Sequence, residues 1–212
     1  MPLFRQLFDP ASATLTYLVA DPVTRAAALI DPVSAQLDTL RALLGRLGLS
    51  LRYVLRTHAR PDGVTDTLPG LRAETGARLA AHAAAPLADC DQRLRDGDVV
   101  YLGEELLEII HTPGATPCSS TFRWDDRLFT GDTLWIGRAG DLAGPQADAG
   151  TLHDSVHARL FRLPDEYLVY PGRDRHGRRV SCIAQEKLTN ADLRLSRDAF
   201  VAAMRSPATA RP

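Results

Sequence analysis

The sequence predicts a layered α/β fold, because short apolar runs typical of buried strands alternate along the chain with amphipathic helical patterns. Turn-forming pairs such as Asp9-Pro10 and Asp21-Pro22 separate the first runs. No internal repeat and no linker divides the 212 residues. We therefore expect one domain over residues 1–205 and a frayed tail over residues 206–212.

The first half of the chain contains three β-like runs followed by a helix. The helix is expected over residues 34–48, with Ser34 as a plausible N-cap, Gly48 as its stop and a stripe of leucines on one face. A buried strand over residues 51–56 then leads into a polar loop, and a second helix is expected over residues 65–75. The three opening runs are residues 3–8, 14–20 and 26–30.

The second half continues this alternation after an alanine-rich stretch over residues 80–88. A glycine- and alanine-rich loop over residues 136–150 precedes a helix expected over residues 151–163. The expected strands are residues 98–101, 106–111, 121–124, 127–129 and 167–170, and short helices are expected near residues 182–188 and 196–204.

Composition excludes several classes of partner. The formal net charge is −1 and the sequence pI is about 6.6, so no broad basic field favours nucleic acid or an anionic membrane. No apolar run has the length of a spanning helix, and the first residues lack the apolar core of a signal peptide. Cys90, Cys118 and Cys182 are far apart and form no CxxC pair, which favours a reducing cytoplasmic location.

Four polar loops follow expected strands, which is where α/β folds place catalytic residues. Their sequences are THARPDG, HTPGATPCSS, FTGDTLW and VYPGRDRHG, and they resemble the metal-binding loops of the metallo-β-lactamase superfamily. The N-terminal run and the segments TLHDSVHARLFRLPDEYLVYPG and NADLRLSRDAF are similar to the persulfide dioxygenase, ethylmalonic encephalopathy protein-like, branch. The resemblance extends from about residue 4 to residue 200. It implies a four-layer αβ/βα sandwich with one iron at its edge, which converts glutathione persulfide into sulfite and glutathione.

The match to that superfamily's ligand motif is incomplete. Three positions of a vestigial site keep the family residue, and four ligand positions are substituted. The retained residues are His58, Asp62 and Asp132, and the substituted positions hold Arg60, Gly63, Ala115 and Arg173. In the persulfide dioxygenases the iron ligands correspond to positions 58, 115 and 132, so the resemblance leaves one His and one Asp for a metal. The family segment Cys-Gly-Arg-Thr-Asp-Phe reads AGDLAG here, over residues 139–144.

The leading hypothesis is a metal-free pseudoenzyme with a binding or regulatory role, connected to sulfur or thiol metabolism. A loss of imidazole ligands and a gain of two guanidiniums both disfavour a dication, so no tightly bound metal or other cofactor is expected. We expect Arg60 and Arg173 to pair bidentately with Asp62 and Asp132. The partner would be a small molecule or a protein, not identified by the sequence, and a homodimer stays open.

Two enzymatic alternatives remain. A weak mononuclear iron or zinc site could use His58 and Asp132, with Asp62 or His111 as a further ligand, in a persulfide dioxygenase or a thiol or thioester hydrolase. A metal-free sulfur transfer through Cys118 is the other alternative.

The remaining polar residues near these loops have simpler interpretations. Asp174 is expected to buttress the last loop, and Asp141 is expected to be exposed to solvent. His176 could approach the pocket. The other histidines are expected on the surface or on helices, namely His82, His153 and His157.

Overall fold

The computed structural model describes residues 3–59, 67–174 and 176–205. The expected frayed tail at 206–212 lies outside this range. So do three of the motif positions, Arg60, Asp62 and Gly63.

The first sheet contains six strands in the order β1-β2-β3-β4-β5-β6. Neighbouring strands are antiparallel from β1 to β3 and parallel from β3 to β6. The first three strands match the expected runs closely. The strands are β1 (Leu3–Asp9), β2 (Thr14–Ala20), β3 (Ala26–Ile30), β4 (Ser50–Arg56), β5 (Arg78–His82) and β6 (Gln92–Leu94).

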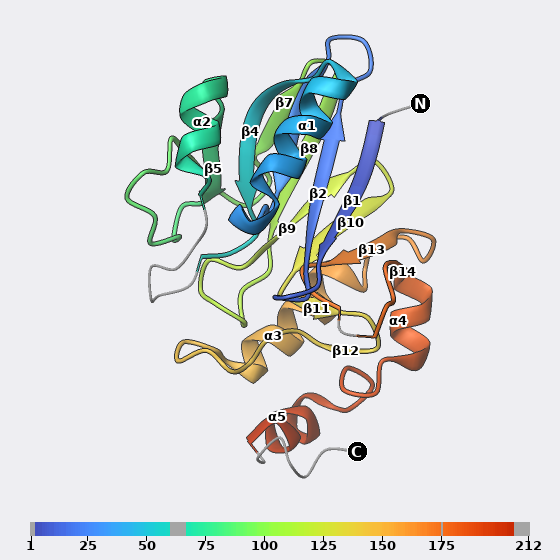
Figure 1. The fold of residues 1–212 in the computed structure, drawn as a ribbon. Coiled ribbons are helices and arrows are strands. Elements are labelled where there is room, and N and C mark those ends of the chain that lie inside the picture. The colour runs from blue at the N-terminus through green and yellow to red at the C-terminus, as the bar shows by residue number, and fades with distance from the viewer. Residues whose placement is uncertain (1–2, 60–66, 175, 206–212) are drawn as a thin grey trace.

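Two helices cover the outer face of this sheet (Figure 1). Helix α1 (Leu37–Leu47) follows a 3₁₀ turn (Ser34–Gln36) and buries Leu40 and Leu44 against the sheet. It ends at Gly48, whose left-handed backbone lets its N–H reach the carbonyl groups of the last turn. Helix α2 (Pro69–Thr75) lies beside it.

The second sheet has the order β14-β13-β10-β9-β8-β7. Only β10 and β13 pair in parallel. Its strands are β7 (Val99–Leu102), β8 (Glu105–His111), β9 (Ser120–Trp124), β10 (Arg127–Gly131), β13 (Leu168–Pro171) and β14 (Ser181–Cys182). A two-stranded ribbon, β11 (Leu134–Trp135) and β12 (Arg138–Ala139), follows β10.

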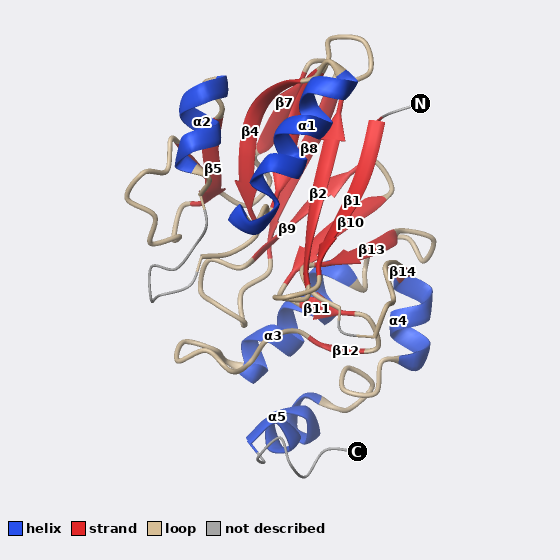
Figure 2. Cartoon of the chain, in the orientation of Figure 1, coloured by secondary structure: helices blue, strands red, loops and turns tan. Residues whose placement is uncertain are grey.

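Three helices complete the outer layer on this side (Figure 2): α3 (Ala149–Ser155), α4 (Ile183–Thr189) and α5 (Arg197–Arg205). They bury apolar residues such as Leu152, Ile183 and Phe200 against Leu128 and Val169 of the second sheet. Between the two sheets lies a core rich in aromatic residues, which includes Tyr17, Trp124, Phe129 and Tyr170. The order helices–sheet–sheet–helices confirms the predicted four-layer α/β sandwich.

Several segments differ from the sequence expectation, which included neither strand β6 nor the ribbon of β11 and β12. The alanine-rich stretch was expected to hold no strand, but it contains β5, whose Ala80 and Ala81 pack on opposite faces of the first sheet. The helix expected over 151–163 is shorter, because α3 changes at Val156 into a π-helical turn (Val156–Leu160). In this turn the Phe161 N–H bonds to the carbonyl of Val156, five residues earlier.

Glycines bring the ends of the strands close enough to form a site. Gly131 ends β10 with a φ of +53°, and a Cβ there would lie 2.2 Å from Thr57 Oγ1. The Gly172 N–H donates to the Gly131 carbonyl at 2.7 Å, and a Cβ on Gly172 would lie 2.8 Å from the Gly131 carbonyl carbon. Only glycine permits this approach. The residues that follow β3, β4, β10 and β13 therefore converge at one end of the sandwich.

Candidate functional site

A buried carboxylate, Asp31, holds the loop that follows β4. It comes directly after β3 and is only 4% exposed. Its two oxygens accept the Thr57 backbone N–H at 2.9 Å and the Thr57 hydroxyl at 2.6 Å, and Arg56 Nε lies 3.7 Å away. Because both carboxylate oxygens are used, the direction of the chain entering the loop is fixed.

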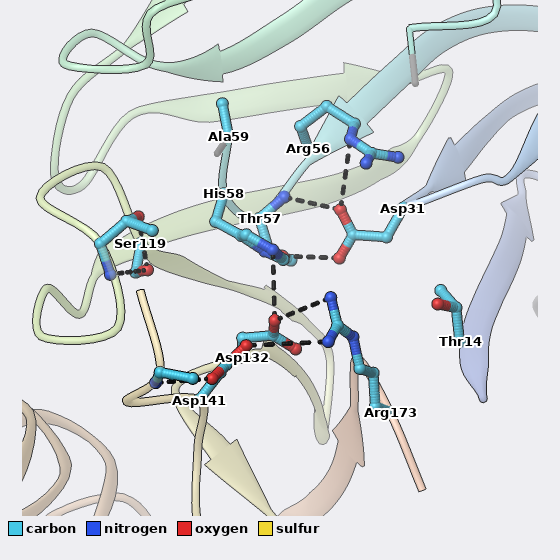
Figure 3. A network of polar contacts seen from close by, with 12 residues as sticks. Thr14, Asp31, Arg56, Thr57, His58, Ala59, Ser119, Asp132, Asp141 and Arg173 are labelled. Carbon is cyan, nitrogen blue, oxygen red and sulfur yellow. Dashed lines mark hydrogen bonds and ion pairs between the residues drawn. The ribbon is translucent and has the colours of Figure 1, made fainter. Parts of the chain in front are cut away.

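The same contacts orient His58. The single hydroxyl proton of Thr57 is donated to Asp31, so Thr57 Oγ1 is left to accept from the Nδ1–H of His58, 3.0 Å away. The Nε2 atom then points at Asp132 Oδ2, at 3.3 Å (Figure 3). A hydrogen bond on one ring nitrogen commonly orients the other toward a metal or a charged partner.

Asp132 is the second buried carboxylate of the site. It follows β10 and is also 4% exposed. Trp135 Nε1 donates to its Oδ1 at 3.2 Å, and its backbone carbonyl accepts the Asp141 N–H at 3.0 Å. Its Oδ2 faces His58 at 3.3 Å and Arg173 Nη2 at 3.5 Å. These separations are long for direct hydrogen bonds to a carboxylate.

Arg173 reaches Asp132 from the loop after β13. A backbone bridge to Thr14 holds this position. The guanidinium lies between two carboxylates, with Nη2 3.5 Å from Asp132 and Nη1 3.7 Å from Asp141 (Figure 3). The expectation of a bidentate pair on Asp132 is wrong for Arg173, because its two nitrogens contact different acids. The expected exposure of Asp141 is also wrong, since its side chain is only 23% exposed beside Arg173.

Both members of this pair differ in charge from the residues that the family resemblance assigns to their positions. Asp141 stands where the persulfide dioxygenase segment has arginine, and Arg173 stands where the superfamily motif has histidine. The two substitutions meet in space as an acid and a base. Each therefore compensates the charge introduced by the other.

Among the described residues, the donor set is smaller than a tightly held iron or zinc ion ordinarily has. His58 and Asp132 supply two ligands, whereas such sites ordinarily use three or four protein ligands. The third position of the family's iron site is Ala115, a buried methyl group with no donor atom. In residues 3–59, 67–174 and 176–205, no group of three or more His, Cys, Asp or Glu side chains is arranged to hold a metal ion.

His111 is not placed to act as a replacement ligand. Its Nε2 lies 2.9 Å from the Pro117 carbonyl oxygen. Its ring stacks on His82, with centroids 3.9 Å apart and planes 6° apart. His176 is exposed, and its backbone N–H donates to Asp174.

His153 and His157 form a second stacked pair, with centroids 4.1 Å apart. Their Nε2 atoms lie 3.2 and 3.0 Å from the carbonyl oxygens of Leu195 and Leu193, respectively. His153 lies on helix α3, as expected of a helix histidine, but it is buried and not on the surface. The pair connects α3 and the turn after it to the segment before α5.

Cys118 has a structural environment. Its side chain is buried, with 2% exposure. Its sulfur accepts the Ala59 N–H at 3.3 Å and lies 3.5 Å from the Ala59 carbonyl oxygen and 3.2 Å from Thr116 Oγ1. The thiol thus connects the loop after β4 to the loop after β8.

Sequence reasoning missed three residues that build the site: Asp31, Thr57 and Trp135. Asp31 had a weak signal, as a charged residue before a proline at the end of an apolar run. The roles of the other two depend on contacts between loops and have no local signal.

Three comparisons with known proteins place the chain in a family. The model of the metallo-β-lactamase superfamily matches residues 64–173. The human mitochondrial persulfide dioxygenase ETHE1 is 39% identical over 210 residues, covering 95% of this chain and 80% of the relative. The chain belongs to the metallo-β-lactamase superfamily. Within it, the chain is a homologue of the persulfide dioxygenases.

Solved structures and a second group of relatives agree with this placement. The crystal structure of ETHE1 from Myxococcus xanthus matches with a TM-score of 0.92 and 38% identity, covering 99% of this chain and 92% of that one. A hydroxyacylglutathione hydrolase from a Polaromonas strain is 36% identical over 170 residues, covering 77% of this chain and 63% of the relative. The predicted fold and family resemblance are thus confirmed. The loss of the metal site is not tested by these similarities.

Of the helices in the described part of the chain, none is long and apolar enough to cross a membrane. The cytoplasmic location, the single domain and the exclusion of nucleic acid stay predictions.

Proposed function

We propose that this persulfide dioxygenase homologue binds a small thiol derivative at the Asp132–Arg173 site without a resident metal ion, in a binding or regulatory role. The observation that carries the proposal is the position of Arg173, whose guanidinium lies 3.5 Å from the one Asp132 oxygen that also faces His58. A cationic side chain thus occupies the neighbourhood in which the family's motif places a ligand for a cation.

Electrostatics supports a metal-free site. A dication bound to Asp132 Oδ2 at about 2.1 Å would lie within about 5.6 Å of Arg173 Nη2, since that nitrogen is 3.5 Å from the same oxygen. At an effective dielectric constant of about 20, the dication and the guanidinium of Arg173 repel each other by about 6 kcal/mol at that distance. Arg173 in this position therefore opposes the binding of a dication at Asp132.

The substituted residue Arg173 suits an anionic sulfur group. A thiolate or persulfide carries a negative charge, and Arg173 is 27% exposed, so part of its guanidinium can meet a ligand while two carboxylates hold it. The relatives are named for persulfides and for hydroxyacylglutathione, which are both derivatives of thiols. We accordingly assign the ligand to this chemical class.

Anaerobic calorimetric titration with glutathione persulfide tests this assignment, with glutathione and S-methylglutathione titrated in parallel. We expect saturable binding that Arg173→Gln weakens about tenfold or more, as the loss of one charge-assisted contact predicts. Arg46→Gln, at an exposed position on α1, is the matched control and should leave binding unchanged. Equal affinity of the wild-type chain and Arg173→Gln would refute the proposal.

The second candidate is a mononuclear iron or zinc enzyme, a persulfide dioxygenase or thiol or thioester hydrolase, that uses His58 and Asp132. The comparisons favour this candidate over the metal-free one, because the similar curated proteins are named as enzymes. The 3.3 Å between His58 Nε2 and Asp132 Oδ2 also suits two neighbouring ligands of one ion, which are about 3 Å apart for bonds of about 2.1 Å at right angles. This candidate requires a third ligand, and its metal must bind in spite of the repulsion from Arg173.

Oxygen consumption with glutathione persulfide, after anaerobic loading with iron(II), separates the two candidates. Turnover that is lost in His58→Ala would support the enzyme. No turnover, combined with Arg173-dependent persulfide binding, would support the metal-free site.

The sulfur-transfer alternative depends on access to Cys118. Its buried thiol predicts no mass adduct on this residue when the folded chain is treated with a persulfide. An adduct on Cys118 would revive that alternative.

A further inference from the structure

A cavity lies at the end of the sandwich opposite Asp132. Its volume is about 360 Å³, and it opens where β3, β4 and β5 begin. Arg52 on β4 lines it, whereas His58 follows the opposite end of the same strand. Six residues of extended chain span about 20 Å, so the cavity is well separated from Asp132. Figure 1 shows the turn between β2 and β3 at the end of the sandwich away from β11 and β12.

The wall of this cavity is preorganised by another buried acid, Asp21. Its carboxylate accepts the Val23 N–H at 2.8 Å, the Thr24 hydroxyl at 2.6 Å and the Glu104 N–H at 3.1 Å. The Thr24 hydroxyl, followed by the Val23 N–H, lowers the pKa of Asp21 to about 2, so these bonds persist at neutral pH. Gly103 packs against Thr24 so closely that a Cβ would lie 2.1 Å from the Thr24 hydroxyl oxygen. The β7–β8 turn is thus fixed to the β2–β3 turn.

Two arginines, Arg52 and Arg78, line the cavity, while the nearest acids, Asp21 and Asp91, lie behind or beside its wall. Arg78 starts β5 beside Tyr53 of β4, and Arg52 lies at the register shift between β3 and β4. No carboxylate lines the cavity. Arg78 donates to the backbone oxygen of Asp91 at 3.4 Å, and its charge contributes to lowering the pKa of the Asp91 carboxyl. In the described part of the chain no ion pair joins Arg52 to an acid, so its guanidinium is the more available of the two. Two guanidiniums that share one hollow attract an oxyanion.

Aromatic side chains flank the arginines from both sheets. Tyr53 comes from the first sheet and is half-buried, and Tyr101 comes from β7 of the second sheet and is 65% exposed. Such rings, and guanidinium planes, offer flat surfaces on which a planar group can stack. The volume lies at the lower end of the range of about 300–1,000 Å³ for small-molecule sites, so the ligand must be small.

We propose that this cavity binds a small organic oxyanion that carries a flat ring, with the oxyanion between Arg52 and Arg78 and the ring against Tyr101. The oxyanion is a phosphate or a carboxylate, and both share the chemistry that the arginines recognise. This site is independent of the function proposed for Asp132 and Arg173.

Amide chemical-shift mapping on the ¹⁵N-labelled chain tests the proposal, with phenyl phosphate as the probe. Gly76, Arg78 and Gly103 line the cavity, and their amide signals should shift saturably as phenyl phosphate is added. Benzoate in a second titration distinguishes a carboxylate from a phosphate. Inorganic phosphate in a third tests the contribution of the ring and should bind more weakly.

Variants assign the binding to individual side chains. Arg52→Gln and Arg78→Gln should each weaken phenyl phosphate binding about fivefold or more, and Tyr101→Ser should reduce the preference for phenyl phosphate over inorganic phosphate. Arg46→Gln is the control and should bind as the wild-type chain does. The amide spectrum of each variant shows directly that it is folded.

Three results would overturn the proposal. The first is the absence of saturable shifts up to about 10 mM probe, because a specific site of this kind should have a higher affinity than that result allows. The second is a set of shifts at other residues, and the third is an affinity that neither arginine variant changes.

Discussion

Two buried carboxylates sit at corresponding places in the two sheets, and their surroundings differ. Asp31 follows β3 and Asp132 follows β10, and each is 4% exposed. Asp31 accepts two hydrogen bonds of 2.6 and 2.9 Å from one neighbour, Thr57. The contacts of Asp132 with Trp135, His58 and Arg173 are 3.2 to 3.5 Å long.

The difference separates a fully hydrogen-bonded structural acid from the acid at which we propose that a ligand binds. Tight, complete hydrogen bonding makes Asp31 part of the framework, because removing it would leave buried donors without partners. The polar groups of Trp135, His58 and Arg173 approach Asp132 only at longer distances, so its contacts are weaker than those of Asp31. A buried acid at a strand end is thus not enough to identify a functional site, and the length of its contacts carries the information.

The largest expected effect is on Asp31. We expect Asp31→Ala to lower the free energy of unfolding by about 3–5 kcal/mol, because Arg56 and both Thr57 donors lose a buried acceptor. Urea denaturation measures this loss. Asp38→Ala is the control, since the Asp38 side chain is almost fully exposed on α1, and it should change stability by less than about 0.5 kcal/mol. A loss below about 1 kcal/mol for Asp31→Ala would remove the distinction between the two acids.

The second effect tests whether Asp132 still has the framework of a metal site around it. Restoring histidine at both substituted positions, in the double variant Ala115→His, Arg173→His, should raise zinc(II) affinity about 100-fold or more. A competition titration against a chelator measures the affinity. The same substitutions with Asp132→Ala added should abolish the gain. If the double variant binds zinc no better than the wild-type chain, the geometry around His58 and Asp132 is not that of a metal site.

A smaller effect is expected when Asp132 loses only its charge. Asp132→Asn should change the free energy of unfolding by less than about 1 kcal/mol, because the lost attraction to Arg173 is offset by the lower cost of burying a neutral group. The same urea series measures it beside Asp31→Asn, which should be more destabilising. Equal losses would contradict the contrast between loose and tight contacts.

The smallest effect concerns pH and lies away from both acids. Burial, followed by the nearby His111, lowers the pKa of His82 below its ordinary value of 6.5, while Asp96 acts in the opposite direction. The unfolded chain therefore binds more protons than the folded chain just below pH 6.5, so stability should fall as the pH decreases through that region. Arg159 forms an ion pair with Asp96, which limits the influence of Asp96 on the stacked rings of His82 and His111.

Denaturation between pH 7.5 and about pH 5 should show this slope, and His82→Gln should make it shallower. His176→Gln is the control, because His176 is exposed, and it should leave the slope unchanged. A slope that His82→Gln leaves intact would assign the pH dependence to another group, such as His157, whose pKa burial and then His153 also lower.

The fold was largely predictable, because strong periodic patterns and turn residues mark most of its elements. Strand β5 was missed because its alanines carry little hydrophobic signal. Their small side chains nevertheless fit this strand, which packs against other residues on both faces of the sheet. The short ribbon of β11 and β12 was missed because two-residue strands have no period to detect.

The site was predictable only where a motif names its residues. His58, Asp132 and Arg173 follow from the motif, but Asp31, Thr57 and Trp135 do not, since their roles arise from contacts between loops far apart in the sequence. The geometry of Arg173 was also mispredicted. Which carboxylates a guanidinium reaches depends on loop placement, and the loop that carries Asp141 lies closer than its composition suggested.

We propose that Arg173, and not a metal ion, is the charge partner of Asp132. The metal content of the chain, purified without chelator and reconstituted anaerobically with iron(II) and zinc(II), distinguishes the two partners. If Arg173 is the partner, the folded protein should contain less than about one tenth of an equivalent of either metal. About one equivalent of iron or zinc, lost in His58→Ala, would show instead that a metal ion occupies the site.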